Sequence, residues 1–143
     1  MRVCTPFFYY NLIMAHIFYN SNPHKILVGD CVVRGISNLE DKSWDDTYWG
    51  LCIQGYIDKD MPSSNSVWGN YLYKKGYRQH FIPDTCPNCM TVERFCYEHP
   101  IGEYLLTTGT HVIFSKDGNY YDTWQSGDET IISYWTKGDY YDF

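Results

Sequence analysis

Residues 109–127 read GTHVIFSKDGNYYDTWQSG, and this stretch decides the fold class. Aromatic and β-branched residues flank Asp117-Gly118, a dipeptide typical of two-residue turns between antiparallel strands. With those two residues as the loop, His111 and Asp122 share one face of the hairpin as diagonal neighbours, within about 7 to 8 Å at the backbone. A turn one residue later keeps the shared face, whereas a three-residue loop would put the two side chains on opposite faces.

Helical segments come before this hairpin, and further strands lie on both sides of it. Strands are predicted in segments rich in aromatic and β-branched residues, namely 103–107, 111–115, 119–124 and 130–135. Helical spacing of apolar residues is found over 31–39, from 43 onward, over about 66–75 and around 92–97. Because helices precede strands, the sequence predicts an α+β fold with N-terminal helices followed by an antiparallel β-sheet.

Local signals mark where the first two helices begin. Asp30 is placed to cap the first turn of the helix that opens at Cys31. Ser43 precedes the second helix, and Asp46 three residues later makes a weaker form of the capping box. That second helix is expected to turn one apolar face to the core, made of Trp44, Tyr48, Leu51 and Cys52.

The length and composition indicate one globular domain. The chain has 143 residues, of which 44% are hydrophobic and 19% aromatic, enough to bury one core without support from disulfides. We expect a single domain over residues 1–143, with 1–19 as an N-terminal extension and 138–143 as a tail. Met14 reads as an alternative start of the chain.

Charge and hydropathy argue against two classes of partner, nucleic acids and membranes. The formal net charge is −6 and no basic stripe is present, which argues against nucleic acid as a partner. No apolar stretch approaches the roughly 18 residues that a membrane-spanning helix needs, so we expect no membrane partner. The six cysteines are interpreted as mostly reduced, which favours a cytoplasmic location.

Three residues carry the candidate chemistry. Cys31 follows Gly29-Asp30 at the start of a predicted helix, where unsatisfied backbone N–H groups and the helix dipole favour a thiolate. His111 is a candidate base, and Asp122 is a candidate partner that fixes the imidazole. The alternatives remain a small buried cysteine and a surface histidine and aspartate at a sheet edge. Trp124 is placed to cover the His–Asp pair from water.

Two long motifs, and shorter ones between them, carry a resemblance. NPHKILVGDCVVRGIS (22–37) and GTHVIFSKDGNYYDTWQSG (109–127) resemble small phage and bacterial proteins with a papain-like cysteine peptidase fold. The similarity covers roughly residues 20 to 136, and its other segments are SWDDTY (43–48), IPDTCPNCMTVERF (82–95) and EHPIGEYLL (98–106).

This resemblance implies a papain-like core and a cysteine hydrolase of the peptidase or isopeptidase kind. Cys31 would be the nucleophile, His111 the base and Asp122 the orienting residue, acting on a protein or peptide without a cofactor. Papain-like enzymes commonly place a glutamine shortly before the nucleophile as an oxyanion donor, and none occurs here before Gln54. Asn22 or a backbone N–H near Cys31 is the expected substitute.

A second chemical signal is the CxxC pair Cys86 and Cys89. Together with Cys96 and His99 it gives the pattern C-x2-C-x6-C-x2-H, whose residue types suit zinc but whose halves are closer than usual. The alternative is a loop whose two cysteines are packed or transiently joined by a disulfide.

Three functions are compatible with these patterns. The first is the cysteine hydrolase, for which acyl transfer to an amine would use the same groups. The second is a phage-type protein on the same fold that binds or inhibits a host protein. The third is a zinc-stabilised structural protein, which requires the three cysteines and one histidine of the C-x2-C-x6-C-x2-H pattern to converge.

Overall fold

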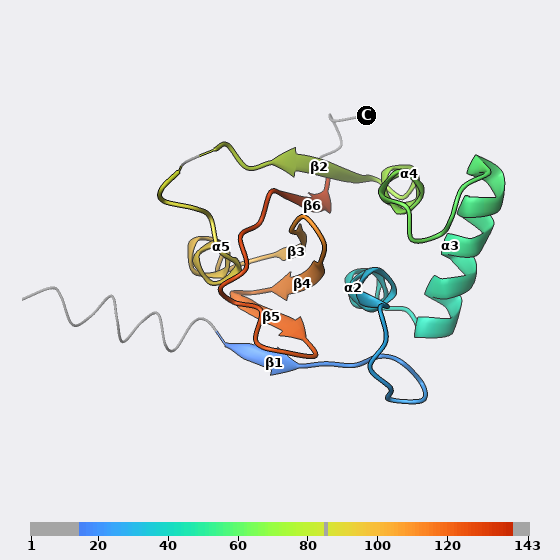
Figure 1. Ribbon diagram of the computed structural model, residues 1–143, viewed down its shortest axis with the longest axis horizontal. Helices are drawn as coiled ribbons and strands as arrows, with labels where there is room; N and C mark the ends of the chain where they lie inside the picture. Colours follow the sequence, from blue (N-terminus) through green and yellow to red (C-terminus); the bar gives the residue numbers. More distant parts are fainter. Residues whose placement is uncertain (1–14, 85, 139–143) are drawn as a thin grey trace, which may run out of the picture.

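Helices cover a mixed sheet in the computed structural model, which describes residues 15–84 and 86–138 (Figure 1). The described helices are α2 (Cys31–Glu40), α3 (Trp44–Asp58), α4 (Asn65–Lys74) and α5 (Val92–Glu98). The described strands are β1 (His16–Phe18), β2 (Tyr77–Phe81), β3 (Glu103–Thr107), β4 (Val112–Lys116), β5 (Asn119–Asp122) and β6 (Ser133–Lys137). The predicted α+β class is therefore confirmed.

The central hairpin has the predicted register. Strands β4 and β5 pair antiparallel with Phe114 opposite Tyr121, so the loop residues are Asp117 and Gly118. Both have positive φ angles, 48° and 82°, as a type I′ turn requires. The six strands form one sheet in the order β1-β5-β4-β3-β6-β2.

The two edge strands differ from the prediction, one in its direction and one in its presence. Strand β1 pairs parallel with β5, so the sheet is mixed, and His16–Phe18 belong to the fold rather than to an N-terminal extension. Strand β2 lies at the opposite edge, where the sequence analysis predicted no strand, and pairs antiparallel with β6. Most β2 side chains are exposed, so the strand lacks the alternation that marks a half-buried strand.

Helix α3 begins as predicted but buries a different face. The Ser43 hydroxyl accepts a hydrogen bond from the backbone N–H of Asp46 at 3.0 Å, which confirms the N-cap. Leu51 is buried, but Tyr48 is exposed, so the prediction that Tyr48 lies in the core is wrong. The buried face is instead made of Thr47, Leu51, Gln54 and Gly55.

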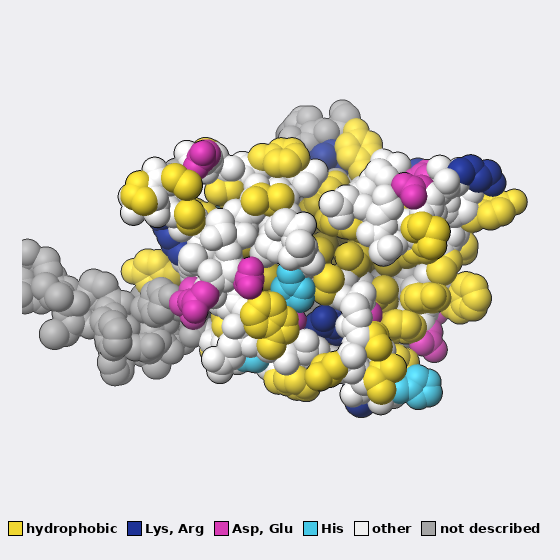
Figure 2. All heavy atoms as spheres, viewed as in Figure 1, with side chains coloured by type: hydrophobic (Ala, Val, Ile, Leu, Met, Phe, Trp, Pro, Cys, Tyr) yellow, Lys and Arg dark blue, Asp and Glu magenta, His cyan; other side chains and the backbone are white. Residues whose placement is uncertain are grey.

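The outer face of α3 is apolar. Trp49, Ile53, Tyr56 and Ile57 are all exposed along it, at helical spacing. Figure 2 shows hydrophobic side chains gathered over α3 at the right of the view. This face lacks the polar residues that usually cover the solvent side of a surface helix.

Helix α2 lies directly against the sheet, and this contact positions the candidate nucleophile. Val33, Ile36 and Leu39 pack into a core shared with Leu105 of β3. A Cβ atom at Gly35 would lie only 2.7 Å from the Leu105 side chain, so glycine allows the close approach. A second core cluster lies beneath α5. Within residues 15–84 and 86–138, no helix combines the length and apolar character needed to cross a membrane.

Candidate active site

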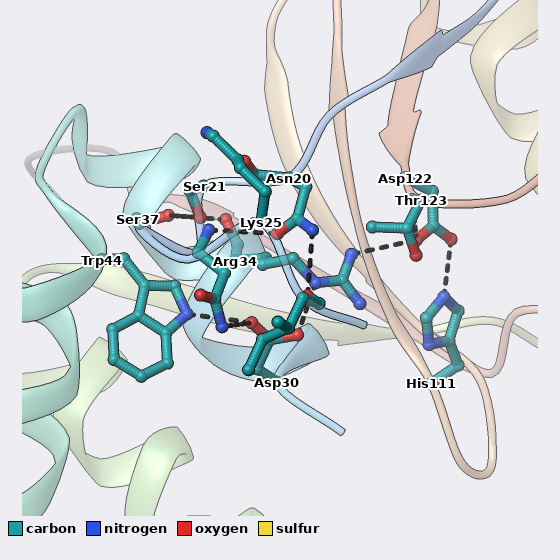
Figure 3. Close-up of polar contacts among 12 residues, drawn as sticks. Asn20, Ser21, Lys25, Asp30, Arg34, Ser37, Trp44, His111, Asp122 and Thr123 are labelled. Carbon is teal, nitrogen blue, oxygen red and sulfur yellow. Dashed lines mark hydrogen bonds and ion pairs between the residues drawn. The ribbon is translucent and has the colours of Figure 1, made fainter. Parts of the chain in front are cut away.

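Three separate elements bring Cys31, His111 and Asp122 together. Cys31 is the first residue of α2, His111 directly precedes β4, and Asp122 ends β5. The His111 Nε2 atom lies 2.6 Å from Asp122 Oδ2, and Cys31 lines the same cleft as His111, whose imidazole lowers the pKa of the Cys31 thiol. Figure 3 shows His111 turned toward Asp122 across the hairpin.

The surroundings of Cys31 acidify its thiol. Burial raises the pKa of Cys31, but several favourable interactions outweigh it. These are the hydrogen bond with His111, a backbone hydrogen bond from Val112, and the positive charges of His111 and Arg34. The pKa of Cys31 therefore lies below its ordinary value, which favours the thiolate.

The pKa values of His111 and Asp122 are shifted in the directions expected of an ion pair. Burial lowers the pKa of His111, but hydrogen bonds with Asp122 and Cys31 raise it to about 9. Burial raises the pKa of the Asp122 carboxyl, yet hydrogen bonds from His111 and Ser126 hold it below its ordinary value. At neutral pH the proton is thus favoured on the imidazole, beside the ionised Asp122 carboxylate.

The Asp122 carboxylate is 1% exposed and fully engaged. Its Oδ2 atom accepts from His111 and from the Ser126 hydroxyl, both at 2.6 Å. Its Oδ1 atom accepts from the backbone N–H of Thr123 at 2.8 Å and from Arg34 at 3.2 Å. Trp124 lies against the His111 ring, with ring centroids 5.3 Å apart, as its position in the sequence suggested. These contacts leave the imidazole little freedom to rotate.

Arg34 is a site residue that the sequence analysis missed. It is 7% exposed, and its Nε atom donates to Asp30 Oδ1 at 2.8 Å while Nη1 donates to Asp122. Figure 3 shows the guanidinium lying between the two carboxylates. The spacing of Asp30 and Arg34, one helical turn apart, was a readable signal for the first of these ion pairs.

Asp30 does not cap α2, which corrects the prediction made from its position. Its carboxylate accepts from Arg34, from the Trp44 indole N–H at 2.9 Å and from the Asn22 amide at 3.4 Å (Figure 3). Helix α2 has no hydrogen bond from an N-cap side chain as a result. The first backbone N–H groups of α2 therefore donate no hydrogen bond to the side chain at the N-cap position.

Asn22 is not placed as the oxyanion donor that the sequence suggested. The residue is buried, and its amide donates to Asp30 while its carbonyl oxygen accepts from the backbone N–H of His24 at 2.9 Å. It does not line the cleft that holds Cys31. The Asn22 side chain instead stabilises the loop before α2, because its Oδ1 atom accepts a hydrogen bond from the backbone two residues later, as in an Asx turn.

Cys31 and His111 open into a cleft of about 380 Å³ between the helices and the sheet. Trp68 of α4 and Trp135 of β6 form part of its apolar wall. Its polar wall includes the side chains of Thr107, Thr108, Thr110 and Ser133. A site that joins a thiol, a base and a cavity of this size has room for a segment of substrate.

The C-x2-C-x6-C-x2-H residues do not converge on one point. Cys86 and Cys89 are exposed, with their sulfur atoms 4.0 Å apart. Cys96 is buried against the Ser115 hydroxyl, and burial raises the pKa of its thiol to about 11. His99 stacks on Phe95 in the second core cluster. In residues 15–84 and 86–138, no three His, Cys, Asp or Glu side chains are grouped to hold a metal ion.

Comparison of the chain with protein-family models, with curated proteins and with solved structures gives no match. The functional assignment therefore rests on the geometry of Cys31, His111 and Asp122.

Proposed function

We propose that this protein is a cysteine hydrolase of the papain-like class that its motifs resemble, acting on a protein or peptide. The observation that carries the proposal is that Cys31 and His111 line one open cleft, with the His111 imidazole held by the buried Asp122 carboxylate at 2.6 Å. The nucleophile stands at a helix start, and the base and its partner come from the sheet packed against that helix. This is the arrangement that nucleophilic catalysis by a thiol requires.

The first half of the reaction transfers the acyl group to sulfur. The Cys31 thiolate attacks the carbonyl carbon, and the carbonyl electron pair moves onto oxygen. The His111 imidazolium then protonates the leaving nitrogen as the C–N bond breaks, which leaves a thioester on Cys31. Asp122 stays ionised throughout and holds the imidazole in the required orientation.

The second half restores the thiol. His111, now neutral, takes a proton from water as the water oxygen attacks the thioester carbonyl. Collapse of that intermediate expels the Cys31 sulfur and releases a carboxylic acid. An amine in place of water would give acyl transfer with the same three groups. The scheme uses no cofactor.

Backbone donors at the start of α2 are the best candidates for holding the oxyanion. Neither Asp30 nor Asn22 turns its side chain to these N–H groups. Preorganised N–H donors at a helix terminus stabilise negative charge developing on oxygen, and one such donor is worth about 10²- to 10³-fold in rate. They would replace the glutamine that papain-like enzymes commonly use.

Alkylation of the cysteines as a function of pH tests the proposal. Iodoacetamide should modify Cys31 before the half-buried Cys52, with an apparent pKa below the roughly 8.5 of a free thiol. Substituting His111→Gln should raise that apparent pKa, because the variant loses both the hydrogen bond and the positive charge at the sulfur. Equal labelling rates for Cys31 and Cys52 would remove the nucleophile from the proposal.

One observation favours a second function, that of a protein-binding module. The exposed apolar face of α3, made of Trp49, Ile53, Tyr56 and Ile57, is of the kind that often marks a protein-interaction surface. A phage-type protein that inhibits a host protein through such a face would not need the thiol. A Cys31→Ala variant that keeps its full biological effect would favour this function over catalysis.

The proposed setting is the cytoplasm of a bacterial or phage-infected cell. All five cysteines in the described ranges are free, and reduced thiols are typical of that compartment. The acidic chain and the site described above fit a protein or peptide partner better than nucleic acid.

A further inference from the structure

The CxxC pair is a chemical signal of the sequence that the proposed hydrolase does not use. Cys86 and Cys89 lie in the loop between β2 and α5, which Figure 1 shows on the opposite side of the molecule from α3. Both are exposed free thiols, and their sulfur atoms lie 4.0 Å apart. Two thiols this close can bind one metal ion together.

The distance between the two sulfur atoms bears on how many ligands such an ion would have. Metal–thiolate bonds are about 2.3 Å long, so two sulfur atoms on opposite sides of a linear, two-coordinate ion are about 4.6 Å apart. The observed 4.0 Å is shorter, which corresponds to a bent arrangement with room for a further ligand. The pair therefore calls for a third donor.

Met90 supplies that donor. It follows Cys89 directly, and it lines the same cavity of about 210 Å³ as both cysteines. Its side chain has three rotatable bonds, so the thioether sulfur can turn toward the two thiols. Asp84 also lines the cavity, but its Oδ1 atom accepts a hydrogen bond from the backbone N–H of Cys86 at 3.1 Å. Within the described chain, no His, Cys, Asp or Glu side chain joins the pair to make a group of three.

Two thiols and one thioether favour Cu(I) over Zn(II). Thiolate and thioether sulfur are soft ligands that select Cu(I), whereas structural zinc takes four ligands drawn from Cys, His, Asp and Glu. The residues that could have completed a zinc site have other partners. Cys96 is buried against the Ser115 hydroxyl, and the Nδ1 atom of His99 lies 2.9 Å from the carbonyl oxygen of Phe95.

The rest of the cavity wall suits a soft monovalent cation. Ile82, Ile131 and Ile132 make it largely apolar, and an apolar shell limits the access of water to a bound metal. Among the described residues that line it, Asp84 is the only charged one, so a cation meets no positive side chain there.

We propose that Cys86, Cys89 and Met90 bind one Cu(I) ion in the loop between β2 and α5. Binding forms two Cu–thiolate bonds and one Cu–thioether bond, and it releases the two thiol protons to water. The copper stays in the Cu(I) state, so no electron is transferred. Neither Cys31 nor His111 takes part, and the site is therefore independent of the proposed hydrolase.

Competition for Cu(I) tests the site on the full-length, reduced protein under anaerobic conditions. The competitor is bathocuproine disulfonate, whose coloured Cu(I) complex reports the metal that the protein does not hold. We expect the protein to retain one equivalent of Cu(I). Cys86→Ser and Cys89→Ser should each weaken binding by roughly 100-fold or more, since even the loss of a residue behind the ligands costs about 10- to 100-fold. Met90→Leu keeps the volume but removes the thioether, and it should weaken binding by about tenfold.

The control variant is Cys52→Ser. It removes a half-buried thiol that does not line this cavity, so the affinity for Cu(I) should stay at the wild-type value. Both ligand cysteines are exposed, so their serine variants should fold, which circular dichroism checks. X-ray absorption at the copper edge should count three sulfur neighbours in the wild type and two in Met90→Leu.

Each part of the inference has its own contrary result. Wild-type affinity in Cys86→Ser or Cys89→Ser would place the copper at other thiols and overturn the site. A sulfur count that is the same in the wild type and in Met90→Leu would remove Met90 from the ligands. Displacement of Cu(I) by an equal concentration of Zn(II) would overturn the choice of metal.

Discussion

Replacing Arg34 with methionine tests the buried ion chain that joins Asp30 to Asp122. The guanidinium is 7% exposed and makes one contact to each carboxylate, at 2.8 and 3.2 Å. Methionine fills similar space without charge, so the variant leaves two carboxylates buried near each other with no cation between them. Removing one partner of a buried ion pair costs about 3 to 5 kcal/mol, and we expect the lower end of this range because Asp122 keeps the His111 imidazolium while Asp30 loses Arg34.

We expect Arg34→Met to lose about 3 kcal/mol of unfolding free energy. With a urea dependence of about 2 kcal/mol per molar, the unfolding midpoint should fall by roughly 1.5 M. Arg34→Lys keeps the charge but not the two-pronged geometry, and its midpoint should lie between those of Arg34→Met and the wild type.

The same variant should alter the reactivity of Cys31. The positive charge of Arg34 contributes to the lowered pKa of the thiol, so its loss should raise the apparent pKa of alkylation. The readout is the rate of iodoacetamide labelling from about pH 5 to 10, across the ordinary thiol pKa, measured on protein shown to be folded by circular dichroism. A loss of less than about 1 kcal/mol in stability, with an unchanged alkylation profile, would refute the idea that Arg34 supports Asp122 and the thiolate.

Three further predictions concern His111, Gly35 and Asn22. The pKa of His111 is about 9 in the folded protein, against 6.5 in the unfolded chain. The protonated imidazole therefore stabilises the fold fully below pH 6.5, and this stabilisation is lost as the pH rises through 9. The difference in unfolding free energy between wild type and His111→Gln should be smaller at about pH 10 than at about pH 6. Gly35→Ala should cost about 1 to 3 kcal/mol in urea unfolding, because the added Cβ meets Leu105, and a cost near zero would contradict the close approach. Asn22→Ala should lose about 1 kcal/mol but keep the alkylation rate of Cys31, and a tenfold slower rate would restore Asn22 to the site.

Elements with strong local signals could be predicted from the sequence. The Asp117-Gly118 turn determines the pairing of its two strands, and the positive φ angles at both residues explain why that dipeptide is selective. Ser43 and its bond to Asp46 likewise depend on residues three apart. The closeness of His111 and Asp122 follows from the turn, so this part of the site could be predicted from the sequence alone.

Features that depend on distant contacts could not be predicted in the same way. Strand β1 has three residues and is held by its pairing with β5, more than a hundred residues along the chain. The second partner of Arg34 could not be predicted either, because its contact with Asp122 spans 88 residues. Tyr48 was assigned to the wrong face because the apolar residues of α3 are spread around the helix and not gathered on one face, which weakens any inference from periodicity.

The parallel pairing of β1 with β5 has a consequence for synthesis of the chain. The backbone N–H of Tyr19 and the His16 ring both hydrogen-bond the carbonyl oxygen of Asp122, so the first strand has no partner until the last part of the hairpin exists. During translation Cys31 leaves the ribosome well before His111 and Asp122, and its thiol then lacks the imidazole that acidifies it. Contacts of such long range also slow folding, since their loop-closure entropy is lost before they form. The Cys31 thiol is therefore expected to keep the lower reactivity of an ordinary cysteine until nearly the whole domain has been made.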